Sequence, residues 1–199
     1  MTNYSVIIIG AGSVGLSLAA ELGWRGISCK IIEKNSTLNS HPRANAVANR
    51  TMEYYRRWGI DNEITNAGIP PDHPADYYWV SSLHGIELHK VSLPPYKKIK
   101  EINNPDDTSV EEHTWSPYLK TITGQNEVEK VLLKYVMSLK SVDISFDNEL
   151  INFSQDSKGV KCDIKNVITG DIDNIKADYL VACDGGKSGV REKLNIKLS

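Results

Sequence analysis

The chain has 199 residues, of which 40% are hydrophobic and 24% charged, and a formal net charge of −2. These values are ordinary for a soluble globular protein and disfavour the disordered and fibrous classes. Because the charges nearly cancel and both signs are interspersed, no field is available to hold a polyanion, and nucleic acid is not expected as a partner.

The chain begins with a predicted strand, helix and strand. Val6 to Ile9 is a short β-branched apolar run, typical of a central parallel strand that is buried on both faces. Apolar residues at helical spacing predict a helix from Ser13 to Trp24 that stops at Gly26, and Ile27 to Glu33 predicts the second strand. Together they form one βαβ unit with a right-handed crossover.

A glycine motif, Gly10-Ala-Gly12-Ser-Val-Gly15, stands between the first strand and the helix. Gly10 permits a tight turn, Gly12 lets the backbone approach a pyrophosphate, and Gly15 lets helix and strand pack closely. The helix N-terminus then offers free N–H groups and the positive end of its dipole to the phosphates. A glycine-rich turn that serves chain geometry alone is the alternative.

Glu33 stands at the end of the second predicted strand, where a carboxylate can accept both hydroxyls of an adenosine ribose. The same carboxylate repels a 2′-phosphate, which disfavours NADP as the ligand of this site. A solvated carboxylate at a strand end is the alternative. These residues leave both NAD and FAD open.

The middle of the chain differs from the first βαβ unit in composition and in its predicted elements. Ala46 to Trp58 predicts a helix stopped by Gly59, and residues 69–117 are rich in proline. Within that stretch, Tyr77 to Ser81 and Ile86 to Val91 predict a hairpin of an antiparallel sheet outside the dinucleotide fold.

The βα pattern then resumes. Apolar residues from Val128 to Leu139 predict a long helix that ends near Lys140. Short strands separated by Asp, Asn and Gly turns follow at Val142 to Phe146, Leu150 to Ser154, Gly159 to Lys165, Ile172 to Ala177 and Tyr179 to Cys183.

Cysteines and histidines give no sign of a metal site. Cys29, Cys162 and Cys183 lie far apart in apolar or strand-like runs and are expected to be buried free thiols. The histidines are scattered through polar stretches, so no metal is expected. The first apolar run is too short for a signal peptide or a membrane span, and a cytoplasmic protein without membrane contact is the default expectation.

Three further segments carry a family resemblance. They are His41-Pro-Arg43-Ala-Asn-Ala-Val-Ala-Asn-Arg50-Thr-Met-Glu53, Gln125-Asn-Glu-Val-Glu129-Lys-Val-Leu132, and Tyr179-Leu-Val-Ala-Cys-Asp184-Gly185-Gly-Lys-Ser188-Gly-Val-Arg191. Each resembles a motif of the class A flavoprotein monooxygenases of the phenol hydroxylase type, and the stretch from Asp72 to Glu87 resembles the start of their substrate domain. With the glycine motif, the resemblance spans nearly the whole chain.

The resemblance implies an α/β fold: a Rossmann-like FAD-binding domain, with a parallel sheet and helices, over residues 1–68 and 118–199. Residues 69–117 would be an inserted part of an antiparallel substrate-domain sheet. The implied cofactor is FAD, with NADH or NADPH as a transient electron donor. The implied reaction is the hydroxylation by O2 of a phenol-like aromatic small molecule, carried out on the flavin itself.

The resemblance also implies roles for single residues. Arg43 and Gln125 would contact the flavin cofactor, with Arg43 near the pyrophosphate, Asp184 would shape the pyrophosphate pocket, and Arg191 is a candidate for NAD(P)H. The complete set of predicted cofactor-binding residues is Gly10, Ala11, Gly12, Ser13, Val14, Gly15, Glu33, Lys34, Arg43, Gln125, Asp184, Gly185 and Arg191. Plain surface or helix-start roles are the alternatives for Arg43, Gln125 and Arg191.

No protein acid or base is nominated for catalysis. Tyr77, Tyr78 and Trp79 could line a substrate pocket, although alternating aromatic residues in a strand more often serve packing. Members of the family continue beyond the Asp-Gly motif, so a complementary C-terminal chain or a second copy is considered as a partner. A non-catalytic fragment, a subunit of a split flavoenzyme and an NAD-dependent dehydrogenase remain the alternative functions.

Overall fold

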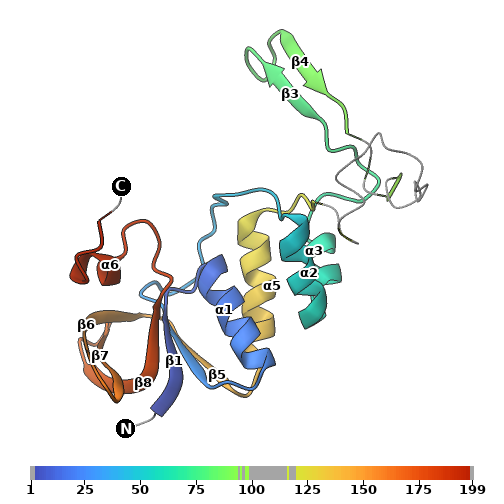
Figure 1. Cartoon of the computed structure of the whole chain (residues 1–199). Helices are drawn as coiled ribbons and strands as arrows, with labels where there is room; N and C mark the ends of the chain where they lie inside the picture. The colour runs from blue at the N-terminus through green and yellow to red at the C-terminus, as the bar shows by residue number, and fades with distance from the viewer. Residues whose placement is uncertain (1–2, 94, 96, 99–115, 117–119, 198–199) are drawn as a thin grey trace. The chain divides into compact units, whose positions relative to one another are not determined.

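The structure is a computed structural model that describes residues 3–93, 95, 97–98, 116 and 120–197 (Figure 1). It comprises two compact units: unit 1 contains Met1–Pro42 and Val128–Ser199, and unit 2 contains Arg43–Glu127. The predicted domain boundary between residues 117 and 118 lies outside the described residues. Within the described part, none of the helices has both the length and the apolar character needed to cross a bilayer.

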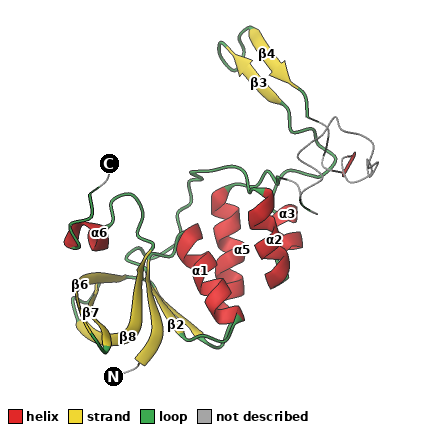
Figure 2. Ribbon diagram, in the orientation of Figure 1, coloured by secondary structure: helices red, strands yellow, loops and turns green. Residues whose placement is uncertain are grey.

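Unit 1 is built on a six-stranded sheet in the order β5-β2-β1-β8-β7-β6 (Figure 2). β1 (Asn3–Ile9) is the parallel centre, with β2 (Cys29–Ile32) on one side and β8 (Ile172–Ala182) on the other. β5 (Val142–Ser145) continues the parallel part beyond β2. The prediction of a central parallel strand at Val6 to Ile9 is therefore confirmed, as is the α/β fold class.

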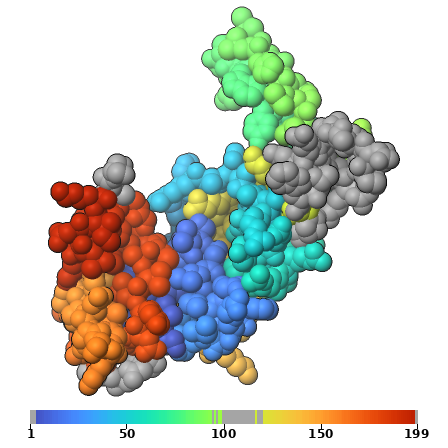
Figure 3. Space-filling view, viewed as in Figure 1, coloured from blue at the N-terminus to red at the C-terminus, as the bar shows by residue number. Residues whose placement is uncertain are grey.

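One long strand joins the parallel and antiparallel parts of this sheet. β8 pairs antiparallel with β7 (Gly159–Asn166) and then parallel with β1, while β7 pairs antiparallel with β6 (Asn148–Asp156). In Figure 3 the hairpin of β6 and β7 lies beside β8. The two strands predicted at Ile172 to Ala177 and Tyr179 to Cys183 are a single strand, because Asp178 continues the extended backbone without a turn.

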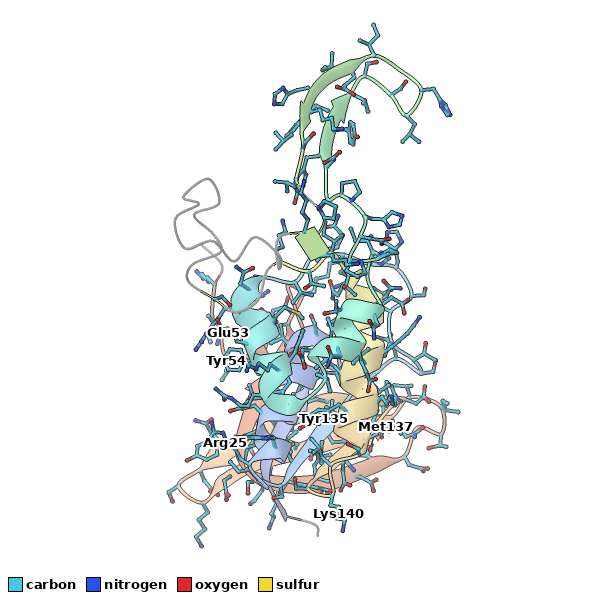
Figure 4. All side chains as sticks on the ribbon, turned by 90° about the vertical axis from the view of Figure 1, so that its right-hand side faces the viewer. Arg25, Glu53, Tyr54, Tyr135, Met137 and Lys140 are labelled. Carbon is cyan, nitrogen blue, oxygen red and sulfur yellow. The ribbon has the colours of Figure 1, made fainter. Side chains whose placement is uncertain are left out.

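Two helices lie side by side in unit 1: α1 (Ser13–Trp24) and the part of α5 (Gln125–Met137) from Val128 onward. Figure 4 labels Arg25 just after α1 and Lys140 just after α5, and both lie at the same end. The two helices therefore run in the same direction, with their N-termini together. Their apolar faces and the sheet form a core whose fully buried members include Ile8, Leu16, Ile31, Leu132 and Val136.

Unit 2 contains two helices and a hairpin. α2 (Asn49–Trp58) begins slightly later than predicted and ends, as predicted, at Gly59, whose φ of 75° is the left-handed conformation of a helix C-cap. α3 (Asp61–Asn66) was not predicted, since six residues are too few for a helical pattern to stand out. β3 (Tyr77–Val80) and β4 (Glu87–Val91) form the predicted antiparallel hairpin.

The cysteines are free thiols, but the prediction that all three are buried is wrong for one of them. Cys29 and Cys162 have no exposed surface, and burial raises the pKa of each thiol to about 11. Cys183 is only half-buried, because it follows the last residue of β8 and lies past the carboxyl end of that strand.

Candidate functional site

The glycine turn links the carboxyl end of β1 to the start of α1, and contacts within the protein require glycine at two of its three glycine positions. Gly10 has a φ of 103°, and a Cβ there would lie 2.5 Å from the carbonyl oxygen of Cys183. A Cβ on Gly15 would lie 1.9 Å from the carbonyl oxygen of Gly10. Both positions therefore exclude any larger residue.

Gly12 is different, because its Cβ position is open: the nearest atom of the described residues is Oε1 of Glu129, 3.9 Å away. Gly12 is also the N-cap of α1 and carries no side-chain cap. The protein itself does not need a glycine here for packing, so the free space lies where a ligand would meet the helix N-terminus. Next to it, Ala11 is buried, Ser13 is half-buried and Val14 is exposed.

Glu33 follows β2 and turns its carboxylate toward the glycine turn. The N–H of Ala11 donates to Oε2 over 2.8 Å, while the backbone N–H and the Nδ2 of Asn35 both donate to Oε1, over 2.9 and 2.6 Å. The carboxylate is thus fixed beside the turn by three donors. Lys34, the next residue, is exposed.

The Asp-Gly segment lies against the same turn. Cys183 donates its N–H to the carbonyl of Ile9 over 2.8 Å, and the Cα of Asp184 lies 3.2 Å from the Cβ position of Gly10. Two motifs that are far apart in the sequence thus meet at the carboxyl edge of β1 and β8, the edge at which open α/β sheets bind ligands.

Asp184 has one buried oxygen without a donor. Oδ2 lies 3.5 Å from the backbone nitrogen of Val190, whereas Oδ1 has no hydrogen-bond partner among the described residues. A buried acceptor in this state is costly unless a ligand supplies the donor, and a ligand hydroxyl would do so. Gly185 follows with a φ of 83°, which only glycine adopts readily.

Arg191 lies in α6 (Gly189–Lys193) and is held by its own segment. Its backbone N–H donates to Oγ of Ser188 over 3.0 Å, and Nη1 donates to the carbonyl of Gly186 over 2.8 Å. The guanidinium therefore braces the loop that follows Asp184.

Arg43 and Gln125 belong to unit 2, where the structure brings their segments together. The N–H of Gln125 donates to the carbonyl of Ala44 over 2.8 Å, so the start of α5 adjoins the residue that follows Arg43. Val47 and Thr121 reinforce this arrangement with two backbone hydrogen bonds of 2.8 and 2.9 Å. The side chain of Arg43 is exposed.

The aromatic residues of the hairpin are not packed in a core. Tyr77, Tyr78 and Trp79 are 41%, 53% and 51% exposed, so among the described residues they do not pack in a core, and both packing and the lining of a substrate pocket stay predictions. They contact polar neighbours instead: Nζ of Lys120 donates to the hydroxyl of Tyr77 over 2.8 Å, and Nζ of Lys90 lies 4.8 Å from the ring centre of Tyr78.

One residue of the site stands in a motif of the sequence but was assigned no role there. Glu129 of α5 is 3% exposed, and its Oε1 accepts the backbone N–H of Ser13 over 2.9 Å. The available signal was its spacing, since Glu129 shares a helix face with Leu132 and Val136, both fully buried. A charged residue on the apolar face of a helix indicates a specific buried partner.

Comparison with known proteins gives a consistent result. A family model described as an FAD binding domain matches residues 3–199. Phenol 2-monooxygenase of Pseudomonas sp. (strain EST1001) is 29% identical over 185 residues, which are 93% of this chain and 29% of that protein. The chain spans about a third of the length of the curated relatives that it matches.

Solved structures agree over almost the whole chain. The substrate-free form of the rebeccamycin biosynthetic enzyme RebC has a TM-score of 0.81 and 31% identity, and the match covers 98% of this chain and 35% of that one. The flavin-dependent monooxygenase PieE, solved in complex with FAD and substrate, has a TM-score of 0.86 and 26% identity, with 100% of this chain and 33% of that one covered.

Proposed function

Since this chain belongs to the family of FAD binding domains, whose model matches residues 3–199, we propose that the turn from Gly10 to Gly15 binds the pyrophosphate of FAD. The observation that carries the proposal is the contrast among the glycines. Gly10 and Gly15 are fixed by contacts within the protein, whereas Gly12 leaves open space at the N-terminus of α1. Backbone N–H groups and the helix dipole stabilise phosphate charge at such a position.

Glu33 and Asp184 suit the hydroxyl groups of the cofactor. The carboxylate of Glu33 is held next to the turn, within reach of a ribose whose phosphate occupies the turn. The buried Oδ1 of Asp184 is an acceptor that a hydroxyl of the cofactor would satisfy. Ala11, Ser13, Val14, Lys34 and Gly185 complete the proposed lining in unit 1.

Arg43, Gln125 and Arg191 keep the roles that the family resemblance implies: Arg43 beside the pyrophosphate, Gln125 at the flavin cofactor, and Arg191 toward NAD(P)H. The hydrogen bond between Gln125 and Ala44 supports a shared role for the first two segments. The positive charge of Arg43 is exposed and suits an anionic group.

The reaction that we propose is the hydroxylation of a phenol-like aromatic compound by a flavin-dependent monooxygenase, of which this chain is the FAD-binding part. Bound flavin supplies the electron transfer and the activation of O2, with NADH or NADPH as the electron source. The residues of this chain bind and orient the cofactor. The partner we propose is an aromatic small molecule, and the proposed location is the cytoplasm.

A competition experiment tests the cofactor assignment. The purified chain is titrated into FAD while flavin fluorescence is followed, and ADP or FMN is then added as a competitor. Because the assigned contacts concern the adenosine and the pyrophosphate, we expect ADP to displace FAD and FMN to compete poorly. If FMN displaced FAD as well as ADP did, the assignment of the glycine turn to the pyrophosphate would be wrong.

A further inference from the structure

Glu129 is a buried carboxylate at the point where the proposed ligand carries its negative charge. It lies one helical turn into α5, is 3% exposed, and accepts the N–H of Ser13 over 2.9 Å. Its Oε1 is also the atom nearest to the open Cβ position of Gly12, at 3.9 Å. The carboxylate therefore borders the space that a phosphate would enter.

The position explains how the protein tolerates this charge. A buried carboxylate is costly unless hydrogen bonds and local dipoles stabilise it. Here the N-terminus of α1 supplies both, through the Ser13 N–H and the positive end of the helix dipole. A phosphate of the ligand would use the same dipole, so Glu129 and the ligand compete for one source of stabilisation.

Glu33 adds a second carboxylate to the turn. Its Oε2 accepts the N–H of Ala11, so Glu33 and Glu129 hold N–H groups on either side of Gly12. The two carboxylates fix the turn before any ligand arrives. They also make the electrostatic potential around the turn more negative, which lowers its affinity for ligands with more negative charge.

We propose that Glu129 is a positioning and specificity residue of the phosphate turn: it fixes the first residue of α1 and lowers the affinity of the turn for each additional negative charge. The inference rests on the proposed function. It assigns to the turn a preference for a pyrophosphate diester, as in FAD, over nucleotides with a terminal phosphate. The fixed backbone provides affinity, and the buried carboxylate provides selection.

The test separates the charge of Glu129 from its hydrogen bond. Glu129→Gln keeps an acceptor for the Ser13 N–H and removes the charge, whereas Glu129→Asp keeps the charge and withdraws the acceptor. The matched control is Glu21→Gln, which removes the same charge from α1 about 12 Å further along the helix. Affinities for FAD, ADP and adenosine are measured by titration and competition, with thermal unfolding as the measure of folding.

For Glu129→Gln we expect FAD to bind about tenfold more tightly, which is near the lower end of the range for a unit charge a few ångströms away. ADP should gain at least as much, and neutral adenosine should stay within about twofold. Glu129→Asp should unfold at a lower temperature and show no gain in FAD affinity. Glu21→Gln, which also breaks the ion pair with Arg25, should leave FAD affinity unchanged.

Three results would overturn the inference. If Glu129→Gln bound FAD no more tightly than the unchanged protein, the charge of Glu129 would not lower FAD affinity. An equal gain for adenosine, or a gain for Glu129→Asp, would assign the effect to the shape of the turn. If the unchanged protein bound neither FAD nor ADP, the proposed function would fail together with the inference.

Discussion

At the scale of single residues, substitutions at two glycines of the same turn are expected to affect different properties, FAD binding at Gly12 and folding at Gly15. Gly12→Ala places a Cβ 3.9 Å from its nearest neighbour, so we expect normal folding and a loss of FAD affinity of about tenfold or more, because the methyl group occupies the phosphate space. Gly15→Ala forces a Cβ to within 1.9 Å of a backbone oxygen and should destabilise the fold by about 1–3 kcal/mol. Thermal unfolding and FAD titration of both variants check this.

Glu33 permits a test against a single part of the ligand. Glu33→Ala should weaken ADP binding by about 1.5–3 kcal/mol, the usual contribution of hydrogen bonds to a charged group. Because the contact is assigned to the ribose hydroxyls, 2′,3′-dideoxy-ADP should bind the variant and the unchanged protein with similar affinity. If the dideoxy ligand lost as much affinity as ADP, the carboxylate of Glu33 would act only through its hydrogen bond to Ala11.

The sequence predicts the residues of this site better than it predicts their contacts. Gly10, Gly15 and Asp184 stand in motifs, and motifs are visible in a single sequence. The packing of Asp184 against Gly10 and the hydrogen bond from Ser13 to Glu129 join distant positions, and no local pattern encodes them. These contacts depend on the pairing of β8 with β1 and on the packing of α5 beside α1.

At the scale of elements, a tyrosine links two strands that are not neighbours. The hydroxyl of Tyr4 in β1 donates to Oδ2 of Asp143 in β5 over 2.6 Å, across β2. Burial and this hydrogen bond raise the pKa of Tyr4 from 10.0 to about 12. Since the folded-state pKa is the higher one, the stabilisation is complete below pH 10 and is lost as the pH rises through about 12.

We therefore expect Tyr4→Phe to lower the free energy of unfolding at pH 7 by about 0.5–1 kcal/mol, because solvent screens a partly exposed pair. Urea unfolding measures the change, and the difference should shrink above pH 10. In an absorbance titration, one tyrosine with a pKa of about 12 should disappear in the variant. An unchanged titration would mean that Tyr4 does not contact Asp143 in solution.

Most elements of unit 1 follow from periodicity, since β1 and α1 carry apolar patterns of the right length. The differences have physical causes. In unit 2, α3 has too few residues to show a pattern. In unit 1, β8 looks interrupted in the sequence because Asp178 is a poor strand former, although the extended backbone of β8 includes it. The pairing of β8 with β7 and β1, which a single sequence does not display, decides the case of β8.

At the scale of the whole molecule, the hairpin of β3 and β4 offers apolar surface to association. Leu83, Ile86 and Leu88 are 95%, 74% and 69% exposed. Replacing Leu83 and Leu88 by Asp should reduce concentration-dependent association in light scattering without changing FAD affinity, because neither residue belongs to the proposed FAD contacts. Replacing Ser82 and His84 by Asp adds the same charges without removing apolar surface, and an equal effect there would assign the change to charge alone.

The pairing of β1 with both β2 and β8 has a consequence for the order of events during synthesis. In β2, Ile7 pairs with Lys30, which is translated soon after it. In β8, its partner is Leu180, which is translated much later. At about 5–20 residues per second, the open side of β1 waits roughly ten seconds or more for that partner on the ribosome. Until β8 has been translated, the nascent chain exposes one side of the apolar strand β1. We expect chaperones to bind the chain mainly during this interval.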